Sequence, residues 1–302
     1  MLARTRGLLL GGIGVLAFSM TLPATRVSVA ELDSTFVGLG RALVAALLAA
    51  ALFLWTGERL PERRLWARIS VVAAGVVVGF PLFTALALQD LPSAHGAVIV
   101  GILPAATAVM AVLRAGERPT PGFWIACAFG LISVLAFAAV EGAGRPQRAD
   151  VFVLVAVALC AVGYAEGGAL AREIGGWRVI CWALLFAAPV ILPAVLLALL
   201  RSGVSEGLSG GPGAWLGFGY VSVVSMFLGF FAWYGGLAAG GVARISQLQL
   251  AQPVLTIFWS AALLGENISA YTLIAALLVL SSVAASQRTR VRGASPGSGK
   301  SC

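Results

Sequence analysis

The sequence predicts an all-α integral membrane protein of ten transmembrane helices, arranged as two inverted five-helix repeats. Three observations lead to this fold class: an apolar composition, ten apolar segments of spanning length, and an internal duplication. Sixty per cent of the 302 residues are hydrophobic and 11% are charged, whereas a soluble domain has about 25% charged residues. Water cannot solvate a chain of this composition, so a soluble globular protein is excluded.

Ten segments are long and apolar enough to cross a membrane. A helix rises about 1.5 Å per residue, so roughly 20 apolar residues cross a hydrocarbon core about 30 Å thick. The predicted spans are 7–24, 36–55, 69–88, 95–113, 121–140, 151–172, 178–200, 213–238, 244–264 and 269–286. Residues 1–24 also fit a secretory signal, but removing them would leave nine spans and break the duplication.

The distribution of arginine predicts the orientation in the membrane. With the N-terminus in the cytoplasm, fifteen of the 20 basic residues lie in inner segments and four in outer segments. Short cytoplasmic segments carry such an excess, so we expect a multi-pass protein of the plasma (inner) membrane with both termini cytoplasmic. The net charge of +8 would suggest nucleic acid in a soluble protein, but here it reflects this bias, and no nucleic-acid partner is expected.

The two halves of the chain are related by a shift of 149 residues. This shift places Pro104 on Pro253, Thr107 on Thr256, Gly116 on Gly265 and Glu117 on Glu266. The predicted units are a first repeat (1–140), a polar loop (141–150), a second repeat (151–286) and a flexible basic cytoplasmic tail (287–302). Because each repeat has five spans, the second is inverted relative to the first, which is a transporter architecture.

Three segments resemble the drug/metabolite transporter superfamily, specifically its EamA-type members. They are GILPAATAVMAVLRAGERP (101–119), QPVLTIFWSAALLGENIS (252–269) and FVGLGRALVAALLAA (36–50). The resemblance covers residues 7–286 and implies ten helices in two inverted repeats, with export or exchange of small metabolites, amino acids or amines by alternating access. Residues 17–20 (AFSM) stand where many relatives have a Trp-Gly pair, so no substrate preference follows.

Prolines and polar side chains inside the spans are the candidate site residues. Pro104 and Pro253 lie in mid-span at matching places of the two halves, and such paired helix breaks point to a central cavity, although simple kinks for packing are the alternative. The ninth span carries Gln249, Gln252, Thr256 and Ser260 on one helix face. We expect this stripe to face inward, where it would bind a polar solute or form hydrogen bonds between helices.

Two aromatic residues stand beside these polar positions. Tyr164 and Trp233 are able to stack on a cation or an aromatic solute. The alternative for Trp233 and its neighbour Tyr234 is anchoring at the membrane surface, because both lie near the predicted inner end of a helix.

Three ionisable residues lie in or at the ends of spans. Arg41 lies near the outer end of its span, where it would reach water, cap an outer gate or bind an anionic group. Glu166 is the one carboxylate well inside a predicted span and is a proton-coupling candidate, with pairing to a cation or reach to the inner surface as alternatives. His95, the single histidine, opens the fourth span; a lone histidine at a helix end is usually structural, and proton transfer is the alternative role.

Other chemistries find little support in the sequence. Residues 294–301 (ASPGSGKS) resemble a phosphate-binding loop but lack the helix that must follow it, so the energy is expected from a gradient rather than ATP. We expect no cofactor and no metal site, because the four cysteines lack ligand spacing. The alternative function is a membrane enzyme acting on lipid-linked substrates. The expected partners are a small-molecule substrate and membrane lipid, with the chain a monomer or a homodimer.

Overall fold

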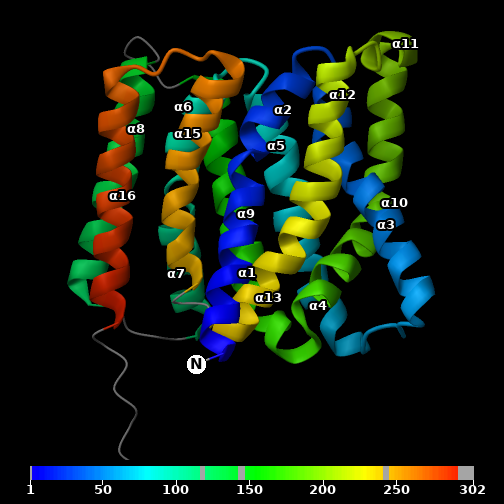
Figure 1. Ribbon diagram of the computed structural model, residues 1–302, viewed down its shortest axis with the longest axis horizontal. Helices are drawn as coiled ribbons and strands as arrows, with labels where there is room; N and C mark the ends of the chain where they lie inside the picture. The colour runs from blue at the N-terminus through cyan, green and yellow to red at the C-terminus, as the bar shows by residue number, and fades with distance from the viewer. Residues whose placement is uncertain (1, 116–119, 142–146, 241–244, 292–302) are drawn as a thin grey trace, which may run out of the picture.

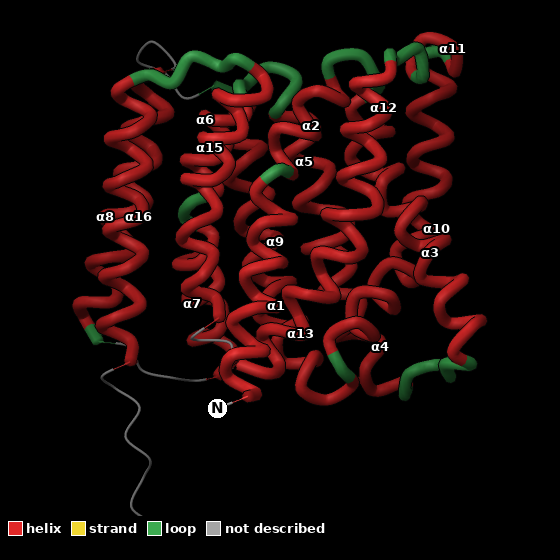
Figure 2. Tube along the Cα trace, in the orientation of Figure 1, coloured by secondary structure: helices red, strands yellow, loops and turns green. Residues whose placement is uncertain are grey.

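The computed structural model describes residues 2–115, 120–141, 147–240 and 245–291. These residues form helices and contain no β-strand, as Figure 2 shows by colour. Seven of the helices have the length and hydropathy to cross a membrane, and three shorter apolar helices accompany them. Most helices run between two ends of one bundle, which we call lower and upper as drawn in Figure 1, the N-terminus lying at the lower end.

The first half of the chain passes repeatedly between the two ends (Figure 1). Its elements are α1 (Leu2–Ser19) and α2 (Thr21–Val29), the π-helical η1 (Phe36–Gly40) with α3 (Arg41–Thr56), α4 (Arg63–Val72) with the π-helical η2 (Ala73–Gly79) and α5 (Phe80–Ala87), α6 (Ser93–Val100) with α7 (Leu103–Ala115), and α8 (Pro121–Glu141).

The second half of the chain also passes between the two ends and finishes at the lower end (Figure 1). Its elements are α9 (Arg148–Ile174), α10 (Gly176–Ser202) with the short α11 (Val204–Gly207), α12 (Pro212–Gly219) with the π-helical η3 (Tyr220–Leu228) and α13 (Gly229–Gly240), the 3-10 helix η4 (Ser246–Leu250) with α15 (Ala251–Leu264), and α16 (Ala270–Val291).

Helices from the two halves pack against each other throughout the bundle. α1 packs on α13, and α9 packs on α4, η2 and α5. α8 and α16 pair with each other at one edge, on the left of Figure 1. The core of buried Val, Ala, Leu, Ile and aromatic side chains is therefore shared between the halves.

Several helices begin earlier than the hydropathy predicts, and two of them have a clear local cause. α4 begins at Arg63 rather than at residue 69, and α9 begins at Arg148 rather than at residue 151. The first turns of α4 are rich in arginine, which lowers their hydropathy but not their helix propensity. The start of α9 is fixed by a capping box between Gln147 and Asp150, which satisfies backbone N–H groups that a helix leaves unpaired.

Glycine allows two close contacts between the halves. A Cβ atom on Gly75 of η2 would overlap the carbonyl oxygen of Leu159 and lie 3.1 Å from the Cα of Gly163 on α9. A Cβ on Gly236 of α13 would lie 2.7 Å from the backbone nitrogen of Gly11 on α1. The absence of side chains lets these backbones approach, as small residues do in membrane helix packing.

We predict that Gly75→Ala destabilises the protein by about 1–3 kcal/mol, because the added methyl group forces η2 away from α9. Gly12→Ala on α1 is the matched control, since a Cβ there would meet no atom within 4 Å. Thermal unfolding of the purified protein in detergent measures the difference. Equal unfolding midpoints for the two variants would contradict this account of the contact.

Candidate functional site

A narrow cavity of about 30 Å³ lies at mid-length of the helices, between the two halves. A cavity of this size admits a water molecule but no metabolite. The lining residues are Phe18, Thr21, Leu22, Arg41, Val76, Phe80, Leu103, Cys160, Tyr164, Ser225, Met226, Phe230 and Gln252.

Irregular stretches of several helices meet at this cavity. α1 and α2 are separated by a turn at Met20, and α6 and α7 by a turn at 101–102. The π-helical segments η1, η2 and η3 and the 3-10 helix η4 contribute lining residues or lie beside them. Hydrocarbon offers no hydrogen bonds to backbone groups, so such irregular backbone is tolerated only where it is buried in protein or lines a cavity.

Pro104 and Pro253 lie at two of these interruptions. Pro104 is the second residue of α7, and Pro253 is the third residue of α15. The sequence predicted a helix break at each proline within its span, and each proline stands in the first turn of a helical segment that follows an interruption. A first turn has unpaired N–H groups in any case, so the missing proline N–H costs little there.

Arg41 lies inside the bundle at the junction of η1 and α3. Its side chain lines the cavity and the residue is 1% exposed, so the prediction that it reaches water is wrong for this conformation. Nη1 lies 3.4 Å from the Thr25 hydroxyl. Nε and Nη2 have no hydrogen-bond partner among the described residues.

The polar stripe of the ninth span faces inward, as predicted. Gln249, Gln252, Thr256 and Ser260 are all buried, but they do different things. Gln252 lines the cavity, whereas Thr256 donates a hydrogen bond of 2.7 Å to the carbonyl of Ser19, where α1 ends. The Ser260 hydroxyl donates to the Thr256 carbonyl.

Gln249 is buried but lies outside the cavity lining. Its amide lies beside Tyr164, and neither amide atom meets a hydrogen-bond partner in the described part of the chain. Gln249 therefore lies beside a lining residue without lining the cavity itself.

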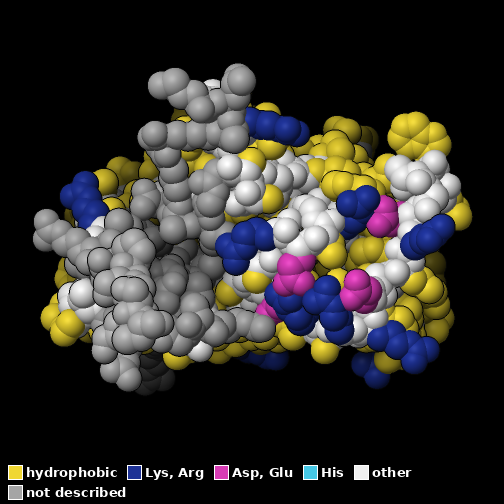
Figure 3. Space-filling view, turned by 90° about the horizontal axis from the view of Figure 1, so that it is seen from below, with side chains coloured by type: hydrophobic (Ala, Val, Ile, Leu, Met, Phe, Trp, Pro, Cys, Tyr) yellow, Lys and Arg dark blue, Asp and Glu magenta, His cyan; other side chains and the backbone are white. Residues whose placement is uncertain are grey.

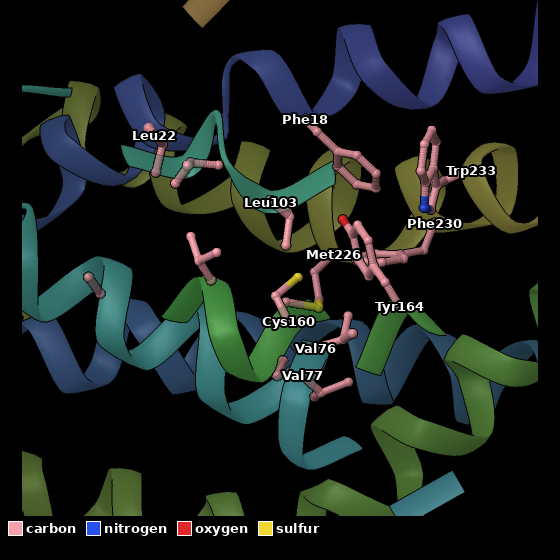
Figure 4. Packing of buried hydrophobic residues seen from close by; sticks show 14 of the residues in the cluster. Phe18, Leu22, Val76, Val77, Leu103, Cys160, Tyr164, Met226, Phe230 and Trp233 are labelled. Carbon is pink, nitrogen blue, oxygen red and sulfur yellow. The ribbon is translucent and has the colours of Figure 1, made fainter. Parts of the chain in front are cut away.

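An aromatic cluster forms one wall of the cavity. Figure 4 shows Phe18, Tyr164 and Phe230 directed toward one another from three different helices. The ring centroids of Phe18 and Phe230 are 4.8 Å apart, and those of Tyr164 and Phe230 are 6.2 Å apart. Trp233 packs behind them, 6.0 Å from Tyr164. Trp233 is 1% exposed and Tyr234 is fully buried, so surface anchoring is wrong for both.

Glu166 lies near the lower end of α9, away from the cavity. Its side chain is fully buried, and Arg68 of α4 donates to it through Nε and to Glu173 through Nη1. Arg178 and Glu58 form a further ion pair of 2.8 Å. Figure 3 shows acidic and basic side chains gathered on the lower face of the molecule. Glu166 thus pairs with a cation, one of the predicted alternatives, and the pair joins the two halves.

His95 makes a comparable contact at the upper end. Its Nε2 lies 2.7 Å from the Asp150 Oδ1 atom, and both side chains are buried. The imidazole also packs on Phe137, with ring centroids 4.7 Å apart. Asp150 also accepts a hydrogen bond from the Gln147 backbone. Sequence reasoning placed Asp150 in a loop and missed this pair, because the two residues are 55 positions apart.

Comparison with known proteins decides the family. The model of the EamA-like transporter family matches residues 5–139 and again residues 147–286. The chain belongs to the EamA-like transporter family. It is 44% identical over 284 residues to the uncharacterized transporter YdeK of Bacillus subtilis (strain 168), covering 94% of this chain and 98% of YdeK. A crystal structure with 21% identity shares the fold, with a TM-score of 0.61 over 96% of this chain and 99% of that one.

In this EamA-like transporter, the Gly-Glu pair that follows α15 closes a contact at the upper end. Gly265 ends α15 with a φ of 63°, a left-handed conformation that favours glycine. Glu266 then accepts hydrogen bonds from the backbone nitrogens of Ser93 and Ala94, at 2.8 and 2.9 Å. These N–H groups belong to the first turn of α6, which attracts negative charge. Glu117, the counterpart of Glu266 in the first half, lies outside the described residues.

Replacing Glu266 with Ala is expected to lower stability by about 1–2 kcal/mol, because it leaves the first N–H groups of α6 without an acceptor. Glu206→Ala is the matched control, since Glu206 is exposed in the short α11. Thermal unfolding of both variants in detergent tests the contact. A Glu266→Ala midpoint equal to that of the control would show that the carboxylate does not hold α6.

Proposed function

We propose that this EamA-like transporter is a secondary active transporter that exports or exchanges a small metabolite, amino acid or amine by alternating access. Its binding site is the central cavity, with Arg41, Gln252 and Tyr164 in the lining and Gln249, Thr256 and Trp233 supporting them. The observation that carries the proposal is the convergence of irregular helical segments from both halves on one cavity, whose lining includes Arg41 and Gln252. Interrupted helices that meet at mid-membrane are the binding-site arrangement of many secondary transporters.

Polar contacts between the two halves lie on both sides of the cavity along the bundle. Arg68 with Glu166 lies below it, and Glu266 with the start of α6 lies above it. Contacts of this kind contribute modest net stability, since each partner also hydrogen-bonds well to water. The contacts at one end can therefore break while those at the other end stay formed, which alternating access requires.

We further propose that the chain has ten spans in two inverted repeats. Three features support this arrangement. The shift of 149 residues carries η2 into η3, and it carries the turn at 101–102 to the start of α15. Helix pairs also correspond: α9 packs on α4, η2 and α5 as α1 and α2 pack on α12, η3 and α13. α1 begins and α16 ends at the lower end (Figure 1), which we assign to the cytoplasmic side of the plasma membrane.

Cysteine labelling tests this orientation. In a variant whose native cysteines are replaced by alanine, Asn267→Cys should react with a membrane-impermeant maleimide in intact cells. Thr120→Cys, in the corresponding loop of the first half, should react only after permeabilisation, because an inverted repeat places the two loops on opposite sides. Reaction of both cysteines in intact cells would contradict the inverted arrangement.

Glu166 is the proposed proton-coupling group, with His95 as the second candidate. When the lower end opens, α4 and α9 separate and Glu166 loses Arg68, its partner across the halves. A carboxylate that loses its cation within the membrane is favoured in the protonated form. The opening of the lower end and the uptake of a proton are then linked events.

We predict that Glu166→Gln retains solute flux but loses its dependence on an imposed pH gradient, because the amide cannot bind the proton. Flux from proteoliposomes loaded with a metabolite panel, with and without the gradient, measures both properties. Glu173→Gln is the control, since Glu173 also contacts Arg68 but its side chain is 36% exposed. Gradient-dependent flux in Glu166→Gln would exclude this role, and absence of flux from the unmodified protein would refute transport itself.

A further inference from the structure

We infer that the transported solute carries a carboxylate, which Arg41 binds in the central cavity, on a small apolar or aromatic body. The inference rests on the proposed transport function and narrows it, because it excludes solutes whose only charge is positive. It begins from the placement of one charged side chain inside the bundle.

The Arg41 guanidinium is buried with most of its hydrogen-bonding capacity unused. Arginine stays protonated under all physiological conditions and carries five N–H donors. The residue is 1% exposed, and in the described part of the chain its hydrogen bond to another side chain is the one to the Thr25 hydroxyl, at 3.4 Å. A buried charge is strongly unfavourable unless an opposite charge and hydrogen-bond acceptors accompany it.

The protein provides no opposite charge at this position within its described ranges. No ion pair there includes Arg41, whereas Arg64, Arg68 and Arg178 all pair with glutamates. The acidic residues nearest in sequence are held by backbone groups of the upper loops: Glu31 accepts from Gly211 and Asp33 from Phe36. The anion that matches Arg41 must therefore come from the solute.

The rest of the lining favours a single carboxylate over a phosphate. Arg41 is the one cation among the lining residues, so it balances one negative charge but not two. The other polar groups of the lining are the Gln252 amide, the Tyr164 hydroxyl, the Cys160 thiol and the hydroxyls of Thr21 and Ser225, which lie 2.8 Å apart; none of them is a cation. A carboxylate also matches the two parallel donors of a guanidinium.

The aromatic wall indicates the remainder of the solute. Phe18, Tyr164 and Phe230 face one another beside the cavity (Figure 4). When the cavity widens, these rings present apolar faces to whatever occupies it. An apolar or aromatic body attached to the carboxylate would bury its surface there.

A set of probes that share one body and differ in charge tests the inference on the full-length protein in nanodiscs. The probes are N-acetylphenylalanine (anion), phenylalanine (zwitterion), N-acetylphenylalaninamide (neutral) and phenylalaninamide (cation), with the leucine series as a smaller, aliphatic body. The measurement is the shift of the thermal unfolding midpoint with probe concentration. We expect the two carboxylates of at least one series to bind and their amide counterparts to fail.

Variants of Arg41 test whether this residue binds the carboxylate. Arg41→Gln should weaken carboxylate binding by at least about tenfold, and Arg41→Lys by less, because lysine keeps the charge but not the paired donors. Arg201→Gln is the control, since Arg201 is exposed at the end of α10. Arg41→Gln should also unfold at a higher temperature than the unmodified protein without probe, because it removes a buried charge.

Several results would overturn the inference. Binding of an amide as tightly as its acid, binding of no carboxylate, or unchanged binding in Arg41→Gln would each do so. A lower unfolding temperature of Arg41→Gln would show that the guanidinium holds the fold together instead. Flux in proteoliposomes separates this failure from failure of the transport proposal: flux of neutral or cationic solutes alone refutes the carboxylate, whereas absence of all flux refutes transport.

Discussion

The structure depends on one constraint, which is that hydrocarbon forms no hydrogen bonds with a polypeptide backbone. A helix that breaks within a membrane must therefore turn its break toward protein or toward an enclosed polar space. Here the turn at 101–102 is buried, and η2 and η3 each bury one side and supply residues to the cavity lining. The irregular segments and the cavity occur together because backbone that departs from the α-helix must be buried in protein or line a cavity.

The same constraint separates two kinds of buried charge. Glu166 is fully buried, but Arg68 neutralises it, and the pair joins α9 to α4 near the lower end. Arg41 is equally buried and has no such partner among the described side chains. A paired charge belongs to the framework that closes the bundle, whereas an unpaired one at the centre creates an affinity for an anion. Both side chains are buried, so the difference between them is that Glu166 has an oppositely charged partner and Arg41 has none among the described residues.

The sequence was sufficient for features that depend on local pattern. The inward polar stripe from Gln249 to Ser260 follows from helical spacing, and the helical fold follows from hydropathy. The sequence could not supply contacts between residues far apart, such as His95 with Asp150. It also gave no sign of the π-helical segments, because their Val, Ala and Ser residues are ordinary in a membrane helix. Trp233 was misjudged because its nearness to a helix end says little when a neighbouring helix covers it.

α9 links the two ends of the cavity mechanically. It is one α-helix from Arg148 to Ile174, while the other helices that line the cavity contain a π-helical segment, a 3-10 segment or a turn. Asp150 binds His95 at its upper end, and Glu166 binds Arg68 near its lower end. Sixteen residues separate these contacts, about 24 Å along the axis. A rod of this length cannot tilt away from α4 below without changing its angle to α6 above, so in the proposed cycle the opening of one end and the closing of the other are a single movement.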